Sequence, residues 1–352
     1  MKTIAAVKAA VGDSRMFLML CFGISCGLPY ILTKSPLQAW MTLSQVNLKT
    51  IGIFALVGLP YTLKFLWAPV VDHFFPPFLG RRRGWAMLFS VAAAFALLFL
   101  SMADPTQSLS QIAFLAVLLS FFGASQDIVV DAYRAELWSK EKDKLGLANS
   151  VHIGGYLASI RWVGNAMALV FADSMGWPNT FRVMACIQLL GAVSAFVAPE
   201  PPAMVGPDGL PAPKPTFAES VYMPLVDFFK RTYAVEFLIF ILLYKLGDSL
   251  AGTLFTPFYL KMGFTQTEIG LVAKPIGIFA TIGGGILGGI LMLRFGTFKS
   301  LVGFGVLQAL STAAFAILTL TGPNLWALGS VIAFENLTSG MGTAAYATFM
   351  MS

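Results

Sequence analysis

The sequence predicts an all-α polytopic membrane protein, and three observations support that prediction. Hydrophobic residues make up 57% of the 352-residue chain and charged residues only 11%, whereas soluble domains average about 25% charged residues. The apolar residues fall into runs of about 20, the length that a helix needs to cross a hydrocarbon core about 30 Å thick. Most lysines and arginines lie in the short segments between these runs. Soluble classes of protein are therefore excluded.

Ten apolar segments are long enough to be predicted as membrane spans. Turn and capping signals separate several of them. Asp104-Pro105 lies between the third and the fourth, Trp177-Pro178 opens the sixth, and Thr265 with Glu268 forms a capped start for the eighth. The predicted spans are 15–37, 50–71, 84–102, 109–133, 146–171, 179–198, 234–258, 268–293, 298–320 and 324–349.

Basic residues cluster on one side of these spans. Only Lys49 and Lys261 fall on the other side, with Arg182 just inside the start of the sixth span. Because loops rich in lysine and arginine stay in the cytosol, the larger group and the N-terminus are expected to be cytosolic. That group is Lys2, Lys8, Arg15, Arg81, Arg82, Arg83, Arg134, Lys140, Lys142, Lys144, Lys214, Lys230, Arg231, Arg294 and Lys299.

A proline-rich hydrophilic stretch over 199–232 follows the sixth span. This composition predicts an extended cytosolic linker. Six spans, a linker and further spans are the plan of the major facilitator fold, which has two six-helix halves. We therefore expect an N-terminal half over 1–198, the linker over 199–232 and a second half over 233–352. The second half contains only four predicted spans, so we expect it to be truncated.

Eight ionisable residues lie deep within predicted spans, where each costs about 3 kcal/mol to insert. Such residues usually face a cavity or a partner. The five cations outnumber the three anions, and a cavity with excess positive charge suits a substrate that carries carboxylates or phosphates. The cations are Lys34, Lys64, Arg161, Lys245 and Lys274, and the anions are Asp127, Asp248 and Glu335.

The buried cations are not equivalent as candidate ligands. Arg161 and Lys274 lie well inside their spans with no close partner in sequence, so they are the main candidates for substrate carboxylates. Lys34 has the alternative of extending toward the periplasmic surface. Lys245 and Asp248 are three residues apart and have the alternative of pairing with each other. The expected substrate-binding set is Arg161, Lys274, Lys245, Gln126, Lys34 and Lys64.

The segment from Gly123 to Leu137 concentrates polar residues at the cytosolic end of the fourth span. Asp127 and Asp131 are four residues apart and share one helix face. The charges nearest the cytosol are expected to form a gate network that ties this span to the loop after the second span. Gln126 and Asp127 lie deeper, where transport and structural roles are both open. The expected network is Asp72, Arg81, Arg82, Arg83, Asp131, Arg134 and Glu136.

An ion gradient is the expected source of energy, because the sequence contains no G-x-x-x-x-G-K-[ST] phosphate-binding loop. A proton-driven transporter needs a carboxylate that gains and loses a proton inside the membrane. Asp127 ranks first, because the neighbouring carboxylate of Asp131 makes it a suitable proton acceptor. Glu335 ranks second and Asp248, with Lys245 one turn away, ranks third.

Several segments along the chain carry a specific pattern, namely Ser35-Pro36-Leu37-Gln38-Ala39-Trp40, Gly58-Leu59-Pro60-Tyr61-Thr62-Leu63-Lys64-Phe65-Leu66-Trp67-Ala68-Pro69, Gly80-Arg81-Arg82-Arg83-Gly84-Trp85, the Gln126-to-Leu137 stretch, Lys245-Leu246-Gly247-Asp248 and Gly340-Met341-Gly342-Thr343-Ala344-Ala345. They resemble the AmpG muropeptide permease family of Gram-negative inner membranes. The resemblance implies a major facilitator fold and proton-driven import of anhydro-muropeptides (GlcNAc-anhydroMurNAc-peptides) for peptidoglycan recycling. It also implies a link to β-lactamase induction. Family members continue into further helices beyond the last residue of this chain.

Other functions stay open at this point. An acetyl-CoA-type or other organic-anion transporter of the same superfamily also carries an anionic substrate, and a non-transporting scaffold or receptor would keep the spans without uptake. A membrane enzyme would show acidic or histidine clusters in surface loops, and the short loops here do not. We expect no cofactor, no metal and no nucleic-acid partner. The expected partners of the monomeric chain are an anionic sugar-peptide, protons and lipid.

One apparent nucleotide motif has a simpler interpretation. Gly283-Gly284-Gly285-Ile286-Leu287-Gly288 fits the G-x-G-x-x-G dinucleotide pattern. It lies inside a predicted span with no strand before it, so close packing of helices through small residues is expected instead.

Overall fold

The computed structural model describes residues 13–74, 76–139, 141–202, 226, 229–230, 235–236, 239 and 252–351. Every regular element among these residues is a helix, as expected for an all-α protein. The chain forms two compact units: unit 1 comprises residues 1–164 and 175–239, and unit 2 comprises 165–174 and 240–352. Most of the predicted linker, together with Lys245 and Asp248, lies outside the described residues.

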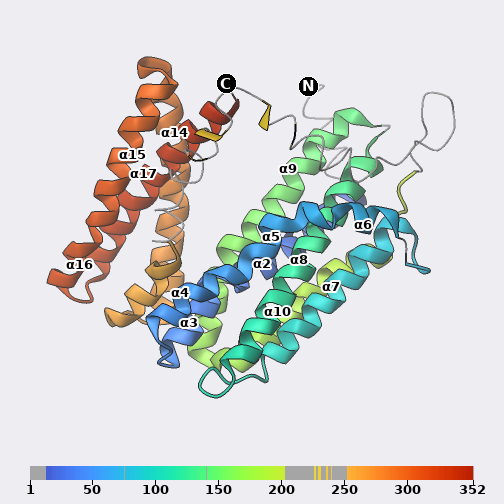
Figure 1. Cartoon of the computed structure of the whole chain (residues 1–352), viewed down its shortest axis with the longest axis horizontal. Helices are drawn as coiled ribbons and strands as arrows, with labels where there is room; N and C mark the ends of the chain where they lie inside the picture. The colour runs from blue at the N-terminus through green and yellow to red at the C-terminus, as the bar shows by residue number, and fades with distance from the viewer. Residues whose placement is uncertain are drawn as a thin grey trace. The chain divides into compact units, whose positions relative to one another are not determined.

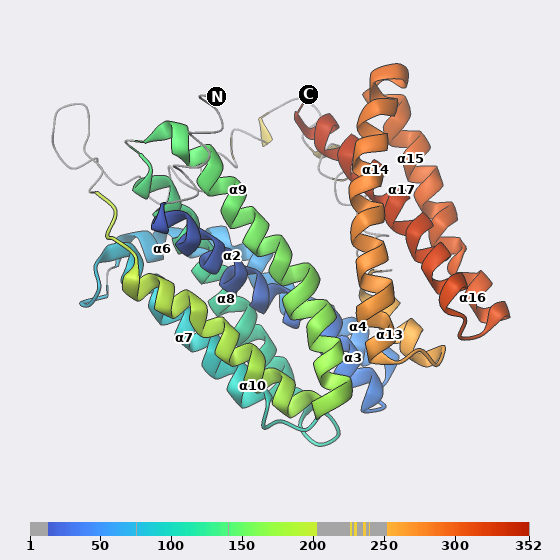
Figure 2. The ribbon, with the colours of Figure 1, turned by 180° about the vertical axis from the view of Figure 1, so that it is seen from behind.

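Unit 1 is a helical bundle whose elements are labelled in Figures 1 and 2. Long helices α2, α7, α8, α9 and α10 form the body of the bundle, and short helices α3 to α6 lie between α2 and α7 in the chain. The bounds are α2 Ser14–Leu32, α3 Ser35–Leu43, α4 Leu48–Ile53, α5 Leu59–Leu63, α6 Ala68–His73, α7 Arg81–Leu100, α8 Leu109–Leu137, α9 Lys142–Ala158 and α10 Ala168–Val197.

Unit 2 contains a helix over 252–261 and the elements that follow it. The predicted capped start at Thr265 is confirmed, because the N–H of Glu268 donates to Thr265 Oγ1 at 3.1 Å and the N–H of Thr265 donates to Glu268 Oε2 at 2.8 Å. The bounds are α13 Gln266–Glu268, the π-helix η5 Ile269–Ala273, α14 Lys274–Phe295, α15 Thr297–Ala313, α16 Phe315–Thr321 and α17 Leu325–Met351.

Seven helices among the described residues are long and apolar enough to cross a membrane. One of them, Lys144–Val197, is 54 residues long, which at about 1.5 Å per residue exceeds twice the thickness of the hydrocarbon core. Gly176 interrupts it with a φ of 80°, a conformation that glycine adopts without strain. This break lies inside α10, next to the predicted Trp177-Pro178 signal, and Figure 2 shows the chain turning back there.

The second predicted span is not one continuous helix. Between α4 and α6 the chain alternates short α-helical turns with two 3₁₀ segments, η1 Phe54–Gly58 and η2 Lys64–Leu66. Pro60 and Pro69 lie at the starts of α5 and α6, where a proline is tolerated because the first N–H groups of a helix have no partner within it. The missing N–H groups end the preceding turns, so the span is broken where Lys64 lies.

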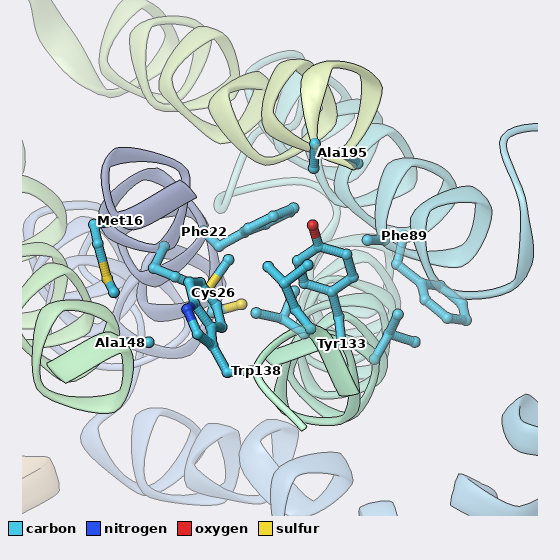
Figure 3. Close-up of a cluster of buried hydrophobic side chains, with 14 of the residues drawn as sticks. Met16, Phe22, Cys26, Phe89, Tyr133, Trp138, Ala148 and Ala195 are labelled. Carbon is cyan, nitrogen blue, oxygen red and sulfur yellow. The ribbon is translucent and has the colours of Figure 1, made fainter. Parts of the chain in front are cut away.

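A buried apolar cluster joins the start of α2 to the end of α8 in unit 1. Figure 3 shows Phe22 and Cys26 of α2, Tyr133 of α8 and Trp138 just beyond it packed against one another. The rings of Phe22 and Tyr133 are 5.7 Å apart between centroids. This cluster places the start of α2 beside the end of α8, where the charged residues predicted to form a gate begin.

Helices α2 and α9 cross with almost no space between their backbones. A Cβ atom at Gly23 would lie 2.2 Å from the carbonyl oxygen of His152, and one at Gly155 would lie 2.4 Å from that of Leu20. Adjacent Gly154, in contrast, has no atom within 4 Å of its Cβ position. Small residues on both helices therefore allow the close approach that stabilises helix pairs in a membrane.

We predict that Gly155→Ala lowers the free energy of unfolding by about 1–3 kcal/mol, because the added methyl group meets backbone that cannot move aside. Gly154→Ala is the matched control and should stabilise the helix by about 0.5–1 kcal/mol, because alanine restricts the unfolded chain. Thermal unfolding of the two purified variants in detergent measures the difference. Equal midpoints for both would contradict the close crossing of α2 and α9.

Helices α14 and α17 pack in the same way. A Cβ atom at Gly284 would lie 2.0 Å from the carbonyl oxygen of Leu337, and one at Gly288 would lie 2.8 Å from Met341 Cα. Gly283 and Gly285 meet nothing within 4 Å. Two glycines of the apparent dinucleotide pattern, Gly284 and Gly288, thus contact α17 and are four residues apart. This confirms that the pattern serves helix packing.

Candidate functional site

Two of the predicted intramembrane charges form an ion pair in unit 1. Lys64, at the start of η2, donates from Nζ to Asp127 Oδ2 of α8. The side chain of Asp127 is 15% exposed and that of Lys64 is 34% exposed. One turn along the broken span, Trp67 Nε1 donates to Ser125 Oγ at 2.9 Å. The irregular second span is thus joined to α8 by polar contacts.

Three tyrosines from three helices lie next to this pair, and we call Tyr30, Tyr61 and Tyr156 the tyrosine cluster. The ring centroids of Tyr30 and Tyr61 are 5.0 Å apart at 83°, and those of Tyr30 and Tyr156 are 6.3 Å apart. Lys34 Nζ donates to Tyr30 Oη at 2.6 Å and lies 3.8 Å from the centroid of that ring. Lys34 therefore turns toward the tyrosine cluster.

Sequence reasoning missed the tyrosine cluster, although a signal was present. Each tyrosine precedes an intramembrane cation by about one turn: Lys34 follows Tyr30 by four residues, Lys64 follows Tyr61 by three, and Arg161 follows Tyr156 by five. A ring that repeatedly accompanies a buried cation differs from an ordinary lipid-facing aromatic residue.

Arg161 lies in η3, a π-helix over Ser159–Met167 that continues α9. Widened turns of this kind occur frequently at functional sites. Within the described residues, the guanidinium of Arg161 has neither an ion pair nor a hydrogen bond, and its side chain is partly buried. It is thus a cation held inside a span without a protein carboxylate, which suits an anionic ligand.

Gln126 lies elsewhere, although it is adjacent to Asp127 in the sequence. Its Nε2 donates to Ser25 Oγ at 2.8 Å, and Gln188 Nε2 donates to its Oε1 at 2.8 Å. Ser90 Oγ donates to the carbonyl oxygen of Gln188 at 2.9 Å. All four side chains are fully buried between α2, α7, α8 and α10. This geometry assigns Gln126 to helix packing and differs from the expectation that it contacts substrate.

The charged residues at the C-terminal end of α8 contact the start of α7. Glu136, buried at 2% exposure, accepts hydrogen bonds from Arg81 Nη2 at 2.6 Å and from Arg82 Nη2 at 2.7 Å. Arg82 also pairs with Asp72. Arg83 Nε donates to the carbonyl oxygen of Ala195 at 2.9 Å and so satisfies the end of α10.

The remaining two members of the expected gate network pair with each other. Arg134 Nη2 donates to Asp131 Oδ1 at 2.8 Å along one face of α8. No contact between this pair and Glu136 is present among the described residues. The network therefore has two parts: a buried cluster at Glu136, and a more exposed pair between it and Asp127.

A second charged cluster was not anticipated. Arg15, at the start of α2, donates to Asp13 Oδ2 at 2.7 Å and to Glu141 Oε1 at 2.8 Å, and Lys144 pairs with Glu141 at 2.7 Å. Hydrogen bonds from the Arg15 guanidinium hold the pKa of both carboxyl groups at about 2. Both stay ionised at physiological pH, so the cluster ties the start of α2 to the segment before α9.

In unit 2, Lys274 begins α14 directly after the π-helix η5. The Nζ of Lys274 donates a hydrogen bond to Thr256 Oγ1, and the two atoms are 3.4 Å apart. Glu335 is buried in α17 at 8% exposure, one residue before Asn336, which accepts a hydrogen bond from Thr281 at 3.2 Å. Lys274 and Glu335 both take part in further interactions with the protein. Lys245 and Asp248 lie outside the described residues.

Comparison with known proteins decides the family. The model of the Major Facilitator Superfamily matches residues 11–352. The chain belongs to the Major Facilitator Superfamily. It is 41% identical over 340 residues to the anhydromuropeptide permease of Escherichia coli strain K12. The aligned region covers 96% of this chain and 67% of that protein. A transporter of Rickettsia conorii that carries the name AmpG 4 is 35% identical, covering 95% of this chain and 81% of the relative.

Solved structures agree on the fold of this superfamily member. The nucleoside transporter NupG superposes with a TM-score of 0.73 at 10% identity, covering 95% of this chain and 82% of that one. A bacterial homologue of the lysosomal transporter Spinster, in an inward-facing conformation, gives 0.61 at 16% identity, with 96% and 75% covered. The chain is thus a multi-pass membrane protein of the transporter class and of the AmpG type, and not an enzyme.

Proposed function

We propose that this chain imports anionic sugar-peptides of the anhydromuropeptide class across a bacterial inner membrane, with protons, for peptidoglycan recycling. The observation that supports the proposal is the Lys64–Asp127 ion pair, because a cation of this kind suits a substrate carboxylate and a buried carboxylate suits a proton. Arg161, which has no protein carboxylate among the described residues, supplies a second cation in the same unit. The similarity to the Escherichia coli permease supplies the class of substrate.

The pair also suggests how proton and substrate movement are coupled. Protonation of Asp127 from the periplasm removes the charge that holds Lys64, and the released ammonium group then binds a carboxylate of the incoming substrate. Loss of that proton to the cytosol restores the pair and displaces the substrate carboxylate. A proton thus accompanies the substrate without nucleotide hydrolysis.

Uptake by membrane vesicles tests the function. Inverted and right-side-out vesicles that contain the chain are given labelled GlcNAc-anhydroMurNAc-tetrapeptide, with and without an uncoupler. We expect inward accumulation that the uncoupler abolishes. Accumulation of acetyl-CoA in place of the sugar-peptide would assign a different organic anion. Uptake equal to that of empty vesicles for both compounds would indicate a scaffold or receptor and would contradict the transport proposal.

We also propose ten spans with a cytosolic N-terminus, on the distribution of lysine and arginine. Single cysteines at Lys49 and Lys214, introduced after replacement of Cys21, Cys26 and Cys186, should react with an impermeant maleimide from opposite sides. Position 49 should be labelled in intact cells and position 214 only after permeabilisation. Labelling of both positions in intact cells would show that the orientation is wrong.

Arg161 is expected to bind a substrate carboxylate through two parallel N–H groups, a geometry that lysine cannot copy. We predict that Arg161→Lys raises the KM for the sugar-peptide about tenfold, equivalent to about 1.4 kcal/mol. Lys274→Gln removes the charge of the candidate ligand in unit 2 and should also raise the KM for the sugar-peptide. Initial rates of vesicle uptake at matched membrane levels measure both. An unchanged KM in both variants would remove these cations from the proposed site.

A further inference from the structure

We propose that the tyrosine cluster is the sugar-binding surface of the transport site, on which the pyranose rings of the substrate pack. This inference rests on the proposed function, because it concerns the same site. The cations Lys64 and Arg161 account for carboxylates, but they do not account for recognition of a disaccharide. A sugar ring presents an apolar C–H face and a rim of hydroxyl groups. A protein surface that binds it must offer both apolar rings and polar tips.

Tyrosine combines these two properties, and the three rings belong to different helices. Tyr30 is in α2, Tyr61 in α5 and Tyr156 in α9, and Tyr30 lies between the other two. The three side chains are all partly exposed. A binding surface for a sugar ring requires aromatic rings that the protein leaves partly uncovered, and Lys34 Nζ covers only one face of Tyr30.

A second aromatic cluster in unit 1 provides a comparison, because its rings serve only to pack helices together. Trp40, Trp177 and Phe181 have ring centroids 5.1 to 6.4 Å apart, which is similar to the tyrosine cluster. These three side chains are 5%, 7% and 0% exposed, and none carries a hydroxyl group. The tyrosine cluster differs in its exposure, its hydroxyl groups and its charged neighbours.

The charged neighbours indicate that the tyrosine cluster faces protein or water and not lipid. Lys34 Nζ lies on Tyr30, and Lys64, one turn after Tyr61, pairs with Asp127. Charged groups at this depth face water or protein. Tyr61 Oη is aimed at α8, where a Cβ at Gly123 would lie 2.2 Å from it, and among the described residues it has no hydrogen-bond partner. The ring of Tyr61 is therefore held in place by α8.

The test separates the sugar from the peptide. Uptake of the labelled disaccharide-tetrapeptide is inhibited with increasing amounts of the peptide-free disaccharide or of the free tetrapeptide. We expect Tyr30→Leu and Tyr156→Leu to raise the concentration of disaccharide needed for half-inhibition about tenfold or more, since each lost ring removes about one stacking contact. Inhibition by the free tetrapeptide should stay unchanged. Tyr30→Phe and Tyr156→Phe keep the rings but lose the hydroxyl groups, so their half-inhibition concentrations for the disaccharide should lie between those of the wild type and of the leucine variants.

Equal inhibition by the disaccharide in the wild type and both leucine variants would overturn the inference while leaving the proposed function intact. Tyr30→Trp provides a measurement that depends neither on uptake nor on the folding of the leucine variants. The chain has seven tryptophans of its own, so the wild-type emission is subtracted from that of the purified variant. The difference spectrum should shift when the peptide-free disaccharide is added and stay constant with the tetrapeptide. No shift at saturating disaccharide would also overturn the inference, whereas a shift in protein that transports nothing would contradict only the proposed function.

Discussion

Asp127→Asn is expected to abolish accumulation of substrate against a gradient while leaving exchange of substrate between the two sides intact. Asparagine is similar in size to aspartate and can still accept a hydrogen bond from Lys64, but it cannot gain or lose a proton. Binding and the conformational change then continue, whereas the link to the proton gradient is lost. The measurement compares uphill uptake under an imposed proton gradient with counterflow in vesicles that have none.

Asp131→Asn is the matched control for this experiment. Asp131 lies one turn along the same face of α8, where its side chain is 47% exposed and pairs with Arg134. Its replacement should leave accumulation dependent on the proton gradient, because Asp127 can still gain and lose a proton. An Asp127→Asn protein that accumulates substrate and remains sensitive to an uncoupler would show that the proton binds elsewhere. Glu335 in α17 would then be the next candidate.

The sequence predicted the individual charges of this site better than their partners. Lys64 and Asp127 each stood out because a charge inside an apolar run is costly. They are 63 residues apart in different spans, and hydropathy contains no information on which spans are neighbours. The pair therefore required the structure, as did the separation of Asp131 and Arg134 from the cluster around Glu136.

Two other features of unit 1 could not be predicted from hydropathy and sequence spacing. Consecutive residues differ by about 100° around the helix axis, so Gln126 enters a buried polar network while Asp127 meets Lys64. The break in the second span arises from Pro60 and Pro69, but mean hydropathy does not distinguish a continuous helix from a series of short turns. Apolar length thus predicts segments long enough to cross a membrane but not how regular the helix in each segment is.

Glu136→Ala is expected to cause the largest loss of stability in unit 1. Its carboxylate is buried and receives hydrogen bonds from Arg81 and Arg82, and Arg82 is itself only 5% exposed. Removing the Glu136 carboxylate leaves the guanidinium of Arg82 buried without its main partner. Breaking a buried ion pair from one side costs about 3–5 kcal/mol. Thermal unfolding of purified protein, together with the amount of folded protein recovered from membranes, measures the effect.

Asp72→Asn tests the same arginine from its exposed side. Asp72 also pairs with Arg82, but its side chain is 49% exposed, and water can replace the carboxylate there, so the expected loss is about 0–1 kcal/mol. Glu136→Gln should fall between the two variants, because the amide keeps the shape and an acceptor oxygen but not the charge. If Glu136→Ala unfolds at the same temperature as Asp72→Asn, burial of the carboxylate does not decide the stability of this network. The arginines would then be held by the loop before α7 and not by α8.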